Sequence, residues 1–131
     1  MTELATIREV LALQTWAVVG LRNNPARPAH GVAQFLQRQG KRVVPVHLQQ
    51  PQDVFGETAY PRLADVPHPV DVVDVFVNSS LAGDIADQAV AGGARAVWFQ
   101  LGVIDEAAAE RVRAAGLLMV MDHCPAIEWG R

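Results

Sequence analysis

The chain has 131 residues, of which half are hydrophobic and 19% are charged, a composition typical of one folded globular domain. The 11 basic residues are outnumbered by 14 acidic ones, and the net charge of −3 argues against a nucleic-acid-binding protein held mainly by phosphate contacts. A single cysteine, Cys124, excludes an internal disulfide framework and a zinc site built from several cysteines.

The start of the chain points to a cytoplasmic protein. Residues 1–4 have neither the cationic start nor the apolar core of a signal peptide. The longest apolar run is far shorter than the roughly 20 residues that cross a bilayer. We therefore expect one reduced, cytoplasmic domain over residues 1–131, with neither a nucleic acid nor a membrane as its partner.

Short apolar segments alternate with helical patterns along the chain. Residues 2–13 carry apolar side chains at helical spacing, with Thr2 as the expected start. After a polar loop, Pro28 suits the first turn of a helix that ends at Gly40. Asn78 and the two serines after it provide capping groups for a later helix. The remaining expected elements are a helical turn near 62–66, helices over 81–91 and 106–115, strands over 16–20, 42–46, 71–77, 95–100 and 117–121, and a tail over 122–131.

This alternation predicts an α/β fold. Strands joined by helices run parallel and are connected by right-handed crossovers. We expect a single doubly wound Rossmann-like domain with a five-stranded parallel sheet. The predicted strand order, numbered along the chain, is 3-2-1-4-5. Pro45 lies in the second strand and is expected near its end or at a bulge, because proline cannot donate a hydrogen bond to a sheet.

Ligands of such sheets bind at the carboxyl ends of the strands, where the strand order reverses. In the predicted order this point lies between the first and fourth strands. The loop after the first strand is the most informative, because Gly20 lets the backbone approach a ligand and a helix N-terminus beyond it suits a phosphate. Arg22 and Arg27 add two guanidinium groups that can pair with phosphate oxygens. The alternative for both arginines is an ordinary surface role.

The same region lacks the fingerprints of other nucleotide-binding loops. A dinucleotide-binding loop needs Gly-x-Gly-x-x-Gly, with an acidic residue about 20 positions later. Here Gly20 stands without the second and third glycines, and His47 follows the second strand. A Walker A loop also needs Gly-Lys-Ser/Thr, which does not occur in the sequence.

Several short motifs follow one another from about residue 15 to the end of the chain. They are Val18-Val19-Gly20, Pro25-x-Arg27-Pro28, Arg42-Val43-Val44-Pro45-Val46, Phe55-Gly56-Glu57, Val70-Asp71-Val72-Val73-Asp74-Val75-Phe76, Val97-Trp98-Phe99-Gln100-Leu101-Gly102-Val103 and Met121-Asp122-His123-Cys124-Pro125. Together they resemble the small stand-alone CoA-binding proteins. The domain of that family is similar to the CoA-binding domain of the succinyl-CoA synthetase alpha subunit and of ADP-forming acyl-CoA synthetases.

The resemblance implies a Rossmann-type domain that binds coenzyme A at the ends of the strands. Carried onto this chain, the cofactor contacts fall on Gly20, Leu21, Arg22, Asn23, Arg27, Val46, His47, Phe76, Val77, Asn78 and Gln100. Adenine would suit an apolar slot lined by Val46, Phe76 and Val77.

Three positions depart from the usual pattern of the family. Arg22 stands where serine is often found, and His47-Leu48 replaces the usual Asn-Pro at the end of the second strand. Asn78 stands where a charged residue is frequent. These departures concern individual contacts more than the class of ligand.

No catalytic residue and no metal site are expected. The synthetase relatives use a phosphorylated histidine of a second domain, and none of the four histidines here matches it or shows metal-ligand spacing. His123 and Cys124 are adjacent, so in an extended segment they point apart, and Cys124 is expected to be a small buried residue. Asp74 interrupts an apolar strand and is expected to have a structural partner, either a helix N-terminus or an arginine such as Arg95.

The function we expect is binding of coenzyme A or an acyl-CoA, without catalytic machinery of its own. One alternative is an NAD(P)-binding oxidoreductase or redox sensor. Another is the CoA-binding half of a split acyl-CoA synthetase. Besides the small-molecule ligand, the candidate partners are a second copy of the chain and a partner enzyme subunit.

Overall fold

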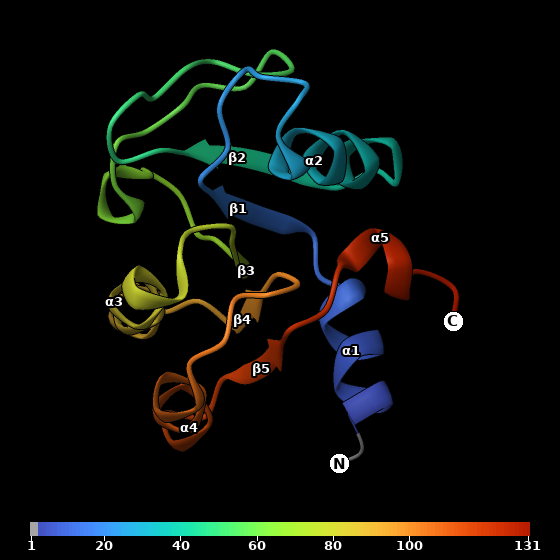
Figure 1. Ribbon diagram of the computed structural model, residues 1–131, viewed down its shortest axis with the longest axis vertical. Helices are drawn as coiled ribbons and strands as arrows, with labels where there is room; N and C mark the ends of the chain where they lie inside the picture. The colour runs from blue at the N-terminus through green and yellow to red at the C-terminus, as the bar shows by residue number, and fades with distance from the viewer. Residues whose placement is uncertain (1–2) are drawn as a thin grey trace.

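A five-stranded parallel sheet lies between two layers of helices (Figure 1). The computed structural model describes residues 3–131. The strands are β1 (Thr15–Val19), β2 (Arg42–Val46), β3 (Val72–Val75), β4 (Ala96–Phe99) and β5 (Leu118–Met121). The helices are α1 (Glu3–Leu11), α2 (Pro28–Arg38), α3 (Ser79–Ala91), α4 (Glu106–Ala114), α5 (Pro125–Glu128) and the short 3-10 turn η1 (Leu63–Asp65). The α/β class and the five-stranded parallel sheet are therefore confirmed.

Most element boundaries lie one or two residues from the prediction, and the first helix, the third strand and the tail differ as follows. The helix expected over 2–13 ends at Leu11, and its expected start at Thr2 lies outside the described residues. The strand expected over 71–77 is limited to the four residues of β3. The tail contains α5, a four-residue helix that begins with Pro125, and a helix this short shows no periodic pattern in a sequence.

The predicted strand order 3-2-1-4-5 is wrong. The observed order is β2-β1-β3-β4-β5, so β3 is a central strand and the order reverses between β1 and β3. Pro45 explains why β2 must be an edge. Its carbonyl oxygen faces outward and accepts a hydrogen bond from the Tyr60 N–H at 3.0 Å, so its missing N–H also lies on the outer side. In the predicted order that side would have paired with the third strand, where a proline breaks the hydrogen-bond ladder.

Each face of the sheet carries its own apolar core. Trp16, Val18 and Trp98 pack with α1, α2 and α5 on one face. Val19, Val75 and their neighbours pack with α3 and α4 on the other face. Side chains alternate along each strand, so continuous apolar strands fill both cores at once. The irregular crossover from β2 to β3 contributes to both cores: Val54 and Phe55 pack on the α2 face, and partly buried apolar side chains between Tyr60 and Val70 pack on the α3 face.

Asp74 is the one acidic residue in the strands, and it faces the interior. Its side chain is fully buried in β3, with Val18 and Trp98 at the neighbouring register positions. Neither carboxyl oxygen has a hydrogen-bond partner among the described residues. The expected partnership with Arg95 is therefore wrong, because Arg95 is exposed at the other end of the neighbouring strand. Burial raises the pKa of Asp74 well above its ordinary value of 3.8.

Among residues 3–131, no helix has the length and apolar character that crossing a membrane would require.

Candidate functional site

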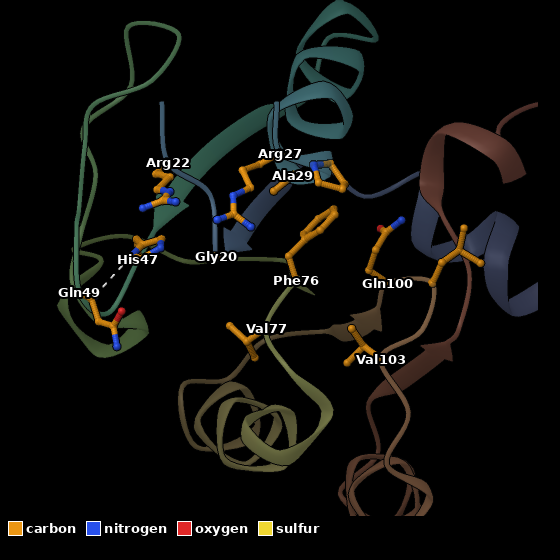
Figure 2. Close-up of a pocket in the computed structure, with 12 residues that line it drawn as sticks. Gly20, Arg22, Arg27, Ala29, His47, Gln49, Phe76, Val77, Gln100 and Val103 are labelled. Carbon is orange, nitrogen blue, oxygen red and sulfur yellow. Dashed lines mark hydrogen bonds between the residues drawn. The ribbon is translucent and has the colours of Figure 1, made fainter. Parts of the chain in front are cut away.

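A pocket of about 440 Å³ opens at the carboxyl ends of the strands, beside the N-terminus of α2 (Figure 2). Its lining consists of Gly20, Arg22, Arg27, Pro28, Ala29, His47, Gln49, Phe76, Val77, Gln100, Leu101 and Val103. These residues follow β1, β2, β3 and β4, and none of them is acidic. The pocket therefore lies where the order of this sheet reverses, which is the expected ligand position in a doubly wound fold.

Gly20 forms the floor of the pocket next to Phe76. Its φ of +102° lies in a region that residues with a side chain rarely adopt, and a Cβ atom built there would lie 3.2 Å from the Phe76 Cβ. The Gly20 N–H donates to the Val46 carbonyl at 2.7 Å, so this turn is fixed to the end of β2. Glycine is required here both by the backbone conformation and by the close approach of two loops.

The N-terminus of α2 lies beside the pocket, where Pro28 and Ala29 form part of the lining. Arg27 is the residue before the first turn and Pro28 is the first helical residue. Within the described chain, no side chain caps this terminus, and the Arg27 guanidinium has no hydrogen-bond or ion-pair partner there. Uncapped N–H groups and the partial positive charge of the helix end favour an anion.

His47 lies beside Arg22, on the same side of the pocket as Arg27 (Figure 2). The His47 Nδ1 accepts hydrogen bonds from the N–H groups of Gln49 at 3.2 Å and Gln50 at 3.0 Å. Two donors on Nδ1 require the ring proton to be on Nε2. Burial lowers the pKa of His47 below its ordinary value of 6.5, and the charge of Arg22 lowers this pKa further.

The opposite side of the pocket carries no charge. Val77 and Val103 line it with the amide of Gln100 (Figure 2), and Leu101 is a further uncharged residue of the pocket lining. Gln100 is only 7% exposed, and its side-chain oxygen has no hydrogen-bond partner among the described residues. A buried carbonyl without a donor is costly, so this oxygen is suited to accept a hydrogen bond from a bound ligand.

The structure brings seven of the eleven expected contact residues together at the pocket. They are Gly20, Arg22, Arg27, His47, Phe76, Val77 and Gln100. Neither arginine forms an ion pair with a carboxylate among the described residues: Arg22 donates to the Gln50 side chain, and Arg27 is exposed, as an ordinary surface arginine also is.

The other four expected residues do not line the pocket. Leu21 and Val46 are buried in the two cores, so Val46 does not form the expected adenine slot. Asn78 caps α3 by accepting from the Ser80 N–H at 2.9 Å. Asn23 is exposed, and its N–H donates to the Gln52 side chain at 3.0 Å.

Five residues that line the pocket were not among the cofactor contacts predicted from the sequence. They are Pro28, Ala29, Gln49, Leu101 and Val103. All five lie in or beside the loops whose position at the strand ends was expected, so the loop positions were the available signal. Which side chains of a loop face inward depends on the packing of the neighbouring loops.

His123 and Cys124 do not form a catalytic pair. Cys124 is buried in the core on the α2 face, as expected. The two nitrogens of His123 instead face carboxylates, with Nε2 at 2.8 Å from Glu3 and Nδ1 at 3.6 Å from Glu128. Within residues 3–131, no group of three or more histidine, cysteine or acidic side chains is placed to hold a metal ion.

Comparisons with known proteins match this chain over nearly its whole length. The family model described as "CoA binding domain" matches residues 14–130. The uncharacterized protein YneT of Bacillus subtilis is 31% identical over 121 residues, which are 92% of this chain and 89% of the relative. A solved structure from Thermus thermophilus, cell-free ID.343, is 35% identical with a TM-score of 0.88, over 98% of this chain and 96% of that one.

A larger protein contains a similar fold. The dinucleotide-forming acetyl-coenzyme A synthetase 1 of Ca. Korarchaeum cryptofilum matches 88% of this chain with a TM-score of 0.74 and 19% identity. The match covers 28% of the synthetase chain, and at this identity it supports the fold alone. The family match, the curated relative and the order of the motifs agree, and the chain belongs to the CoA-binding domain family.

Proposed function

We propose that this protein binds coenzyme A or an acyl-CoA in the pocket beside α2, without catalytic machinery of its own. The observation that carries the proposal is that Arg22 and Arg27 line one pocket beside the uncapped N-terminus of α2. Coenzyme A carries a pyrophosphate and a 3′-phosphate, and guanidinium groups with a helix end are effective donors to phosphate oxygens.

The charged side and the uncharged side of the pocket suggest how coenzyme A is oriented in it. The phosphates belong on the side of Arg22 and Arg27, where the charges are positive. The uncharged side, with Leu101 and Val103, suits the pantetheine arm, which has no ionised group. The buried oxygen of Gln100 can accept from an amide N–H of that arm, which would remove the cost of its missing partner.

An NAD(P)-binding function is less well supported by the same residues. NAD enzymes place an acidic residue after the second strand to bind the ribose hydroxyls. Here the residue is His47, and the described pocket lining contains no carboxylate. A role as the CoA-binding part of a split synthetase is compatible with the proposed ligand. It predicts ATP-dependent thioester formation only when a second subunit is added.

Thermal unfolding with a ligand panel tests the proposal. Coenzyme A, acetyl-CoA, NAD, NADP and ATP are added in turn, each at a series of concentrations. A ligand at 100 times its Kd stabilises a protein by about 2.7 kcal/mol, which corresponds to a Tm shift of about 8–15 °C for a chain of this length. A shift with the CoA compounds alone supports the proposal. A shift with NAD or NADP alone, or no shift with any of them, refutes it.

A further inference from the structure

One histidine organises the segment that closes the cationic side of the pocket. The His47 Nδ1 accepts from two successive backbone N–H groups, those of Gln49 and Gln50. These two hydrogen bonds hold the chain after β2 in a tight turn, and one residue of that turn, Gln49, lines the pocket. The turn is held by an acceptor on a side chain, in the way that asparagine holds an Asx turn.

The same turn is connected to Arg22. The Gln50 side-chain oxygen accepts a hydrogen bond from the Arg22 guanidinium, and Arg22 lines the pocket. A continuous set of hydrogen bonds therefore runs from the His47 ring through the Gln50 backbone and side chain to Arg22. The orientation of the Arg22 guanidinium therefore depends on where the turn holds Gln50.

We propose that His47 is a positioning residue of this pocket: its neutral imidazole holds the Gln49–Gln50 turn and thereby orients Arg22 toward the bound anion. Protonation of Nδ1 replaces the acceptor with a donor, so both backbone hydrogen bonds are lost. The turn and Arg22 are then released, and ligand binding weakens as the pH falls. This inference rests on the proposed function, because it concerns the same ligand.

The groups around His47 favour the neutral ring. Arg22 and Arg27 are the charged residues of the pocket lining, and both are cations. Tyr60 is the titratable residue of the segment paired with the end of β2, where its carbonyl accepts from the His47 N–H at 3.0 Å. Burial and Arg22 both lower the His47 pKa, so the ring is neutral at neutral pH.

The test is a pH series of ligand affinity, measured by calorimetry between pH 8 and pH 5. The ligand is dephospho-coenzyme A, since it lacks the phosphate monoester, which would itself titrate near pH 6. Wild type is compared with His47→Asn, which keeps an acceptor at the Nδ1 position, and with His47→Gln, which moves the acceptor one carbon further out. His68→Asn is the matched control, because His68 does not line this pocket.

For wild type and His68→Asn, we expect Kd to rise as the pH falls through the lowered pKa of His47 and to level off at about ten times its value at pH 8, because protonation loses the same two hydrogen bonds as the His47→Gln variant. His47→Asn should give a flat profile. His47→Gln should bind about tenfold more weakly than His47→Asn at pH 8, because the turn loses both hydrogen bonds. Nitrogen NMR shifts of the wild-type ring should report the Nε2–H tautomer at pH 8.

Two kinds of failure can be separated. If wild type binds neither coenzyme A nor dephospho-coenzyme A at pH 8, the proposed function is wrong, and the inference fails with it. If wild type binds but its pH profile is parallel to that of His47→Asn, the function stands and the inference is wrong. An Nδ1–H tautomer at pH 8 would also overturn the inference, whatever the affinities.

Discussion

Replacing Asp74 with asparagine should make the protein more stable at neutral pH. Asp74 lies in the centre of β3 with no exposed surface, and neither of its carboxyl oxygens has a partner among the described residues. Burial raises its pKa well above 3.8 in the folded protein, whereas the unfolded chain exposes an ordinary carboxyl. An unpaired buried charge is among the costliest groups a protein can hold.

The direction of the pH effect follows from this difference. Below pH 3.8 the carboxyl is protonated in both states and carries no penalty. As the pH rises, the unfolded state releases the proton more readily than the folded state does. The unfolding free energy then falls by about 1.4 kcal/mol per pH unit, until the pH passes the raised pKa of Asp74 in the folded protein. An asparagine side chain does not titrate, so the Asp74→Asn variant should lose this slope.

Urea unfolding of wild type and Asp74→Asn across pH 4 to 8 measures the effect. The two proteins should have similar stability at pH 4, and the variant should gain steadily above it. In thermal unfolding, the gain corresponds to about 4–7 °C per pH unit for a chain of this size. Asp84→Asn, an exposed change on α3, should keep the wild-type slope. Parallel stability curves for wild type and Asp74→Asn would refute the assignment of a raised pKa.

Three further predictions concern the pocket and the core. Arg27→Ala should weaken coenzyme A binding by roughly 1–3 kcal/mol, measured by calorimetry, through loss of a hydrogen bond to a charged group. Arg38→Ala, at the other end of α2, should leave the affinity unchanged, and an equal loss in both variants would remove Arg27 from the site. Gly20→Ala should lower the unfolding free energy by about 1–3 kcal/mol, because of its φ of +102° and the close contact with Phe76; an unchanged urea midpoint would contradict this. Trp98→Phe should lower the unfolding free energy by about 1–3 kcal/mol in the same assay, because the buried indole N–H of Trp98 donates to a backbone carbonyl at 2.8 Å. A decrease below about 0.5 kcal/mol, the size expected for a surface change, would contradict a stabilising role for that hydrogen bond.

The elements of this fold were predictable because their signals are local. The segment expected as the second strand, 42–46, coincides with β2, and Pro28 begins α2 as expected. Asp105 and Asn78 cap α4 and α3 through backbone N–H groups of their own first turns. Each of these features depends on residues within a few positions of one another.

The position of the site was predictable for a related reason. In a parallel sheet with helical crossovers, the loops after the strands all meet at one edge. Gly20, Arg27 and Gln100 therefore come together even though the predicted strand order was wrong. The corrected order moves β3 beside β1, which is why Phe76 lies at the middle of the pocket, in contact distance of Gly20.

The sequence alone determined the class of fold, the sites of its turns and helix ends, and the family, since these depend on local patterns and on motifs in order. Tertiary structure decided the strand order, because two buried strands with similar apolar residues do not identify their neighbours. It also decided that Asp74 has no partner among the described residues and that His47 holds a turn with its Nδ1. The partners of a buried or pocket side chain are set by which distant segments pack against it, and that information is absent from local periodicity.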